Sequence, residues 1–102
     1  MALDILIVDD EQDIRDLVSG VLEDEGYSTR TAAGSADALN ALTERRPSLV
    51  LLDVWLQGSK MDGLQVLEEI KRRDPTLPVL MISGARTIVG WDRLVRAGMA
   101  GD

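Results

Sequence analysis

A run of four apolar residues that ends on a single carboxylate places the strongest constraint on this chain: residues 49–52 are Leu-Val-Leu-Leu, and Asp53 follows them. An uninterrupted apolar run of this length is typical of a strand buried on both faces, as in a parallel sheet covered by helices. The same pattern occurs near the N-terminus, where the apolar residues 5–8 are followed by Asp9 and Asp10. Open parallel sheets bind ligands at the carboxyl ends of their strands, so these acids predict a functional site at one sheet edge.

Strand-like and helix-like segments alternate along the chain. In the first helical segment, apolar residues at 14, 17, 18, 21 and 22 have the spacing of one helical face, and Gly26 is predicted to end that helix in a left-handed conformation. Such alternation predicts an α/β fold, a doubly wound parallel sheet with helices on both faces and right-handed crossovers. The predicted strands are 3–8, 27–31 (an edge strand), 49–53 and 77–82. Four helices are predicted: the first begins after Asp10, the second has Ser35 as its N-cap, the third begins at Asp62 and the fourth at Thr87.

The composition excludes several kinds of site and partner. The chain has no Cys and no His, which excludes thiolate zinc sites and histidine-based catalysis. Its net charge of −7 argues against binding to nucleic acid or to anionic membranes. No apolar run approaches the ~18 residues of a membrane span, and no signal peptide is visible, so the expected location is the cytoplasm. The length of 102 residues predicts a single domain over residues 1–102.

Three predicted strands end on polar residues that the sheet would bring to one edge, namely Asp9 with Asp10, Asp53, and Ser83. Carboxylates ~4 Å apart repel one another by about 4 kcal/mol per pair at an effective dielectric of ~20, so a bound divalent cation or a retained proton is needed to stabilise them. All the candidate ligands are oxygens, which favours Mg²⁺ or Mn²⁺ over zinc or copper. A simpler interpretation makes Asp10 and Glu11 only the acids of a first helical turn, and Ser83 only the start of a turn.

Taken together, these segments resemble the receiver domains of two-component response regulators. Residues 5–11 (Ile-Leu-Ile-Val-Asp-Asp-Glu) are similar to the first strand and acidic turn of that family, 51–53 to its phosphoacceptor strand, and 81–84 (Met-Ile-Ser-Gly) to its fourth strand. The loop at 54–63 is similar to that of NtrX-type regulators, whose receivers precede an ATPase and a DNA-binding domain. The resemblance implies a flavodoxin-like sheet with the strand order 2-1-3-4, forming one receiver domain over residues 1–102.

The resemblance also implies a role for each site residue. Asp53 would be the phosphorylated residue, and Ser83 would contact the phosphoryl group. Asp10 and Asp53 would ligate Mg²⁺ directly, Asp9 would act through water, and the backbone carbonyl of Trp55 would be a further ligand. The implied function is a phosphoacceptor that controls an output such as transcription, rather than a turnover enzyme. The implied partners are a sensor histidine kinase and an output domain.

The chain departs from the family pattern near its C-terminal end. The family has a Lys followed by Pro after its fifth strand; on spacing, this Lys would fall beyond Asp102, so we expect a receiver truncated before the fifth strand and helix. An open edge at 77–82 predicts self-association there or through the fourth helix. Two alternative functions are a receiver-like interaction module that is never phosphorylated and a small Mg²⁺-dependent phosphatase with an aspartyl nucleophile. The second is disfavoured, because the haloacid-dehalogenase pattern requires an Asp where this chain has Trp55.

Overall fold

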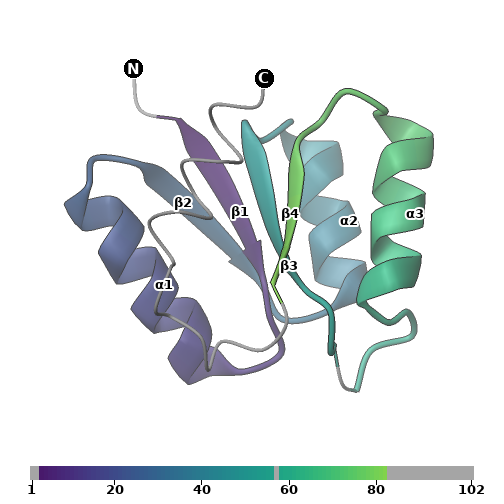
Figure 1. The fold of residues 1–102 in the computed structure, drawn as a ribbon, viewed down its shortest axis with the longest axis horizontal. Helices are drawn as coiled ribbons and strands as arrows, with labels where there is room; N and C mark the ends of the chain where they lie inside the picture. The colour runs from purple at the N-terminus through teal and green to yellow at the C-terminus, as the bar shows by residue number, and fades with distance from the viewer. Residues whose placement is uncertain (1–2, 57, 83–102) are drawn as a thin grey trace.

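The computed structural model describes residues 3–56 and 58–82, and in this part of the chain strands and helices alternate. Four strands form one parallel sheet in the order β2-β1-β3-β4, as Figure 1 shows. The predicted α/β fold and the strand order 2-1-3-4 are therefore confirmed. The elements are β1 (Asp4–Val8), α1 (Gln12–Asp24), β2 (Ser28–Ala32), α2 (Ser35–Glu44), β3 (Leu49–Asp53), α3 (Gly63–Arg73) and β4 (Val79–Ile82).

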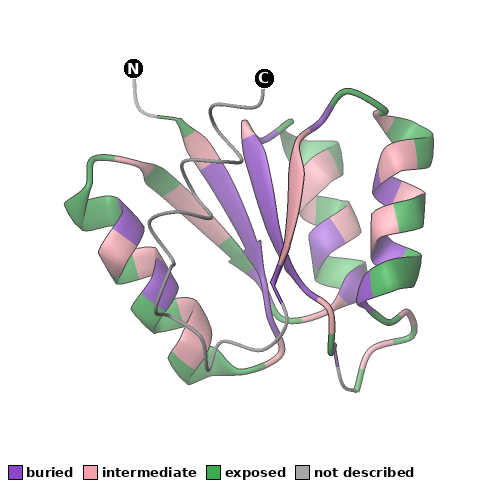
Figure 2. Cartoon of the chain, in the orientation of Figure 1, coloured by how far each residue is buried: buried purple, intermediate pink, exposed green. Residues whose placement is uncertain are grey.

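Helices cover both faces of the sheet, with α1 on one face and α2 and α3 on the other (Figure 1). Successive side chains of a strand point to opposite faces, so β3 contributes to two separate cores. Val50 and Leu52 pack with α2 and α3, whereas Leu49 and Leu51 pack with α1. Figure 2 shows β1 and β3 as the most continuously buried strands. Their apolar runs, which have no polar alternation, reflect this burial on both faces.

The strand register sets the position of the acids. Val8 is paired with Leu52 across the β1–β3 ladder, and Asp53 is paired with Ile82 across the β3–β4 ladder. The chain continues from β1 through Asp9, whose N–H donates to the carbonyl of Ala32 at the end of β2. The carboxyl ends of all four strands therefore lie at one edge of the sheet, as the sequence predicts.

The helix ends match the sequence predictions at some points and differ at others. Gly26 has φ 93°, which confirms the predicted left-handed end of α1. Asp62 caps α3 in a reciprocal capping box with Gln65, as a helix start at this position predicts. The prediction that Ser35 is an N-cap is wrong: Gly34 occupies that position, and Ser35 is the first residue of α2. The hydroxyl oxygen of Ser59, in a loop distant in the sequence, accepts a hydrogen bond from the N–H of Ser35.

Three further predictions concern parts of the chain beyond β4. Ser83, the helix expected at 87–97 and the expected truncation before a fifth strand all lie outside the described residues, so they stay predictions. Within the described ranges, none of the helices is both long enough and apolar enough to cross a lipid bilayer.

Candidate functional site

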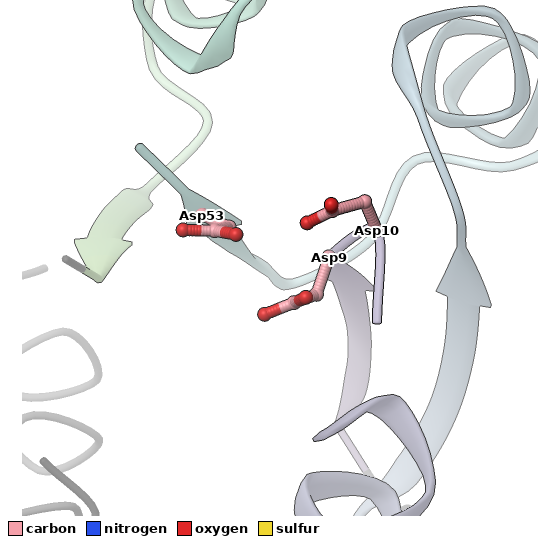
Figure 3. Close-up of side chains that lie close together, drawn as sticks. All are labelled: Asp9, Asp10 and Asp53. Atoms are coloured by element: carbon pink, nitrogen blue, oxygen red, sulfur yellow. The ribbon is translucent and has the colours of Figure 1, made fainter. Parts of the chain in front are cut away.

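Three carboxylates converge at the carboxyl edge of the sheet. Figure 3 shows the side chains of Asp9 and Asp10, from the turn after β1, facing that of Asp53 at the end of β3. One carboxylate oxygen of each residue lies within 4.8 Å of one from each of the others. Asp9 and Asp53 are only 2% and 5% exposed, whereas Asp10 is partly exposed. The structure thus brings together the three acids that the sequence placed at one edge.

Backbone hydrogen bonds hold two of the three carboxylates in place. The N–H of Glu11 donates to Asp9 Oδ1 over 2.9 Å, and the N–H of Trp55 donates to Asp53 Oδ1 over 3.0 Å. The guanidinium of Arg15, in the first turn of α1, donates to the backbone carbonyl of Asp9 over 2.8 Å. These hydrogen bonds orient the carboxylates of Asp9 and Asp53 and the peptide group of Asp9.

Burial is the main perturbation on this cluster. The pKa of Asp9 is raised from 3.8 to about 6. Loss of solvation is the largest cause, the hydrogen bond from the N–H of Glu11 opposes it, and the charges of Asp53 and Asp10 add to it. This rise in pKa reflects the cost of ionising a buried carboxyl beside two other acids. A divalent cation would offset this cost, because it stabilises the charged form of every carboxylate that it contacts.

The raised pKa of Asp9 predicts the pH dependence of stability in a chelator. Between its unfolded pKa of 3.8 and its folded pKa of about 6, the folded chain binds more protons than the unfolded chain. The contribution of Asp9 to the free energy of unfolding therefore falls as the pH rises from about 4 to about 6, and it is lost above the folded pKa. We expect urea unfolding in EDTA to show this fall, and Asp9→Asn to lose it. A wild-type chain that gains stability relative to Asp9→Asn over this window would contradict the prediction.

The donor set fits a hard divalent cation. All three side chains offer carboxylate oxygen, two are buried, and their spacing lets one ion contact more than one of them. Trp55, which the sequence analysis named for its backbone carbonyl, immediately follows this edge and has a side chain that is 68% exposed. Ser83 follows β4, whose last residue, Ile82, is paired with Asp53.

Sequence reasoning missed a close contact behind the cluster. Gly63, the first residue of α3, lies against the backbone of Asp53 and Val54: a Cβ built on it would collide with the carbonyl oxygen of Asp53 and lie 2.7 Å from that of Val54. This contact holds the start of α3 directly against the end of β3. The sequence signal was a Gly at a helical position where Ala would be favoured, and the Asp62–Gly63 pair was interpreted only as a helix start.

With this geometry in place, comparison with known proteins identifies the class. The model of the response regulator receiver domain family matches residues 5–101, and the chain belongs to that family. It is 62% identical over 84 residues to the nitrogen assimilation regulatory protein NtrX of Azorhizobium caulinodans. That match covers 82% of this chain and 18% of the relative, so the chain spans less than a fifth of that protein.

Solved structures agree with this assignment. The crystal structure of the receiver domain of NtrX from Brucella abortus superimposes with a TM-score of 0.78 at 57% identity, covering 93% of this chain and 79% of that one. The response regulator TrrA from Thermotoga maritima, solved in complex with Mg²⁺-BeF, gives a TM-score of 0.82 at 25% identity, covering 96% and 99% of the two chains. The resemblance to receiver domains, and to NtrX-type regulators in particular, is therefore confirmed.

Proposed function

We propose that this chain is a phosphoacceptor receiver domain over residues 1–102, phosphorylated on Asp53 in a Mg²⁺-dependent reaction. The observation that carries the proposal is the position of Asp53: a nearly buried carboxylate at the end of the central strand β3, facing two further acids. Family membership supports it, as does the structure of the relative TrrA, which was solved with Mg²⁺-BeF at 25% identity.

In the proposed reaction, a carboxylate oxygen of Asp53 forms a bond to the phosphorus of the donor. The bond between phosphorus and the leaving group of the donor breaks, and the leaving group departs with the electron pair, which leaves an acyl phosphate on Asp53. The N–H of Trp55, which donates to Asp53 Oδ1, helps to orient the carboxylate for this attack. The contribution of the protein is mainly positioning and charge stabilisation.

The metal site that we propose uses the residues of the acidic edge. Asp10 and Asp53 would ligate Mg²⁺ (or Mn²⁺), Asp9 would contact it through water, and the backbone carbonyl of Trp55 would complete the protein ligands. When bound, the cation supplies charge that neutralises the carboxylates and the phosphoryl oxygens. The hydroxyl of Ser83 is proposed to donate to a phosphoryl oxygen.

Partners, location and assembly follow as further parts of the proposal. The phosphoryl donor in the cell would be a sensor histidine kinase, and the readout would pass to an output domain, as expected for a cytoplasmic receiver. The relatives named NtrX are much longer than this chain, which is compatible with an additional output domain. Self-association would use the 77–82 edge or the helix expected at 87–97.

Mg²⁺ binding can be measured directly through tryptophan fluorescence. Trp55 is exposed and its N–H donates to Asp53, so we expect its emission to change saturably as Mg²⁺ is added at neutral pH. Asp10→Asn removes one negative ligand and should weaken binding at least about tenfold, because even a hydrogen bond to a charged group contributes about 1.5–3 kcal/mol and a carboxylate attracts a doubly charged ion more strongly. Asp13→Asn, which removes an acid from the exposed side of α1, is the matched control and should leave the affinity unchanged.

Phosphorylation itself is tested by incubating the chain with acetyl phosphate and Mg²⁺ and then measuring intact mass. We expect one phosphoryl adduct, and none when EDTA replaces Mg²⁺. A chain that binds Mg²⁺ but forms no adduct would contradict the phosphoacceptor function and favour the interaction module.

A further inference from the structure

The loop between β3 and α3 is anchored at both of its ends. At the start, the N–H of Trp55 donates to the carboxylate of Asp53, and the side chain of Leu56 is buried in the core beneath α2 and α3. At the end, the capping box of Asp62 and Gln65 fixes the first turn of α3. Between these anchors, the side chain of Ser59 makes hydrogen bonds to another element, the helix α2.

Ser59 makes two hydrogen bonds to the first residue of α2. Its Oγ accepts from the N–H of Ser35 over 2.7 Å, and its hydroxyl donates to Ser35 Oγ over 2.8 Å. These residues are 24 positions apart in the sequence. The first N–H groups of a helix have no partner within the helix, and the N-cap of α2 is Gly34, which has no side chain to offer. Ser59 therefore satisfies one of these N–H groups, that of Ser35, from a different part of the chain.

The close approach of the loop depends on Gly34. A Cβ at this position would lie 3.2 Å from Ser59 Oγ and 3.5 Å from Ser59 Cβ, so any larger residue would press on the hydroxyl. Ser35 is only 4% exposed, which means that water cannot readily replace the lost partner. Gly34 leaves space for the side chain of Ser59, and the hydroxyl of Ser35 accepts its hydrogen bond.

We propose that Ser59 is a positioning residue: its bonds to Ser35 hold the loop that follows Asp53 in the conformation that binds the metal, and they tie that loop to α2. The part of this inference that concerns metal affinity rests on the proposed function. The part that concerns the loop does not, because these hydrogen bonds involve only Ser59 and Ser35. Movement of the first turn of α2 would thus shift the loop that follows Asp53, because Ser59 links the two.

The loop part is tested by hydrogen exchange on the full chain in EDTA. Ser59→Ala removes both bonds, and we expect amides in 58–62 and in the first turn of α2 to exchange roughly fivefold faster, the factor that one ordinary hydrogen bond supplies. Ser59→Thr keeps the hydroxyl and should restore slow exchange. Ser48→Ala is the matched control, because Ser48 also accepts one backbone N–H, from Asp4 at the opposite end of the sheet.

The metal part is tested by Mg²⁺ titration of the same variants. Ser59→Ala should raise the dissociation constant for Mg²⁺ roughly fivefold, the factor that corresponds to the loss of one ordinary hydrogen bond. Ser48→Ala should leave the dissociation constant unchanged. Ser35→Ala removes the acceptor hydroxyl but keeps the bond from the N–H of Ser35, so it should give a smaller effect in a chain that still folds.

The outcomes separate this inference from the proposed function. Faster exchange of both segments in Ser59→Ala, with no Mg²⁺ binding even in the wild-type chain, would contradict the proposed metal site. It would still support the role of Ser59 in linking the loop to α2. Wild-type Mg²⁺ affinity in a folded Ser59→Ala chain would overturn the positioning role. If the same amides exchange equally faster in Ser48→Ala, the change reflects a general loss of stability. That result would also overturn the positioning role of Ser59.

Discussion

An Asp53→Asn chain will form no phosphoryl adduct with acetyl phosphate and Mg²⁺, whereas the wild-type chain will form one. The amide has nearly the same size and shape as the carboxylate but lacks the anionic oxygen that attacks phosphorus. Its amide oxygen can still accept the hydrogen bond from the N–H of Trp55, so the turn after β3 is retained. Intact mass, with circular dichroism to confirm folding, measures the result.

Asp62→Asn is the matched control for this experiment. Asp62 follows the same loop and caps α3, and Asn is an equally good N-cap, so this variant should fold and still be phosphorylated. A phosphoryl adduct that persists in Asp53→Asn would show that another residue is the acceptor. An adduct lost equally in both variants would trace the effect to the loop rather than to the nucleophile.

Gly63→Ala will lower the free energy of unfolding by about 1–3 kcal/mol, the usual range for forcing an additional methyl group into a packed site. Helix propensity alone predicts the opposite, a gain of up to about 1 kcal/mol for Ala over Gly. The contact decides the sign: the new Cβ would meet the carbonyl oxygens of Asp53 and Val54 and lie 2.8 Å from the Val54 Cα. These are backbone atoms, which cannot rotate away as a side chain can.

Urea unfolding of Gly63→Ala beside Gly20→Ala isolates this contact. Gly20 lies inside α1, and a Cβ there meets no atom within 4 Å, so the same substitution should stabilise the chain by about 0.5–1 kcal/mol. Opposite signs are expected for the two variants. Two gains would mean that the start of α3 can move away from β3 at little cost, and Asp53 would then be less rigidly held than the structure indicates.

Much of the fold could be predicted because its determinants are local. The continuous apolar runs at 5–8 and 49–52 predicted strands buried on both faces, and the alternation with helices predicted a parallel sheet. The grouping of Asp9, Asp10 and Asp53 followed from one rule, that parallel strands end at the same edge. The weak segment at 27–31 was expected at an edge, and the strand Ser28–Ala32 lies there.

The supports of the site could not be predicted in the same way. The bond between Ser59 and Ser35 joins residues that are remote in the sequence, and Ser35 is the first helical residue rather than the N-cap that the sequence predicted. The contact of Gly63 with Asp53 depends on the path of the loop between them, which no periodic pattern encodes. Patterns of neighbouring residues predict which helices and strands form. The contacts between a loop and a distant helix depend on how the whole chain packs, so these patterns do not predict them.

The separation between the apolar strands and the acids at their ends has a consequence for how such a domain can change over generations. The apolar residues that hold the sheet together are buried in β1 and β3, and the carboxylates stand at or just beyond the ends of these strands. A gene copy released from the need for phosphorylation can therefore exchange Asp53 for Asn, which still accepts the N–H of Trp55, and leave the apolar core unchanged. Descendants that keep the scaffold and lose the chemistry are the expected outcome wherever selection for phosphoryl transfer is relaxed.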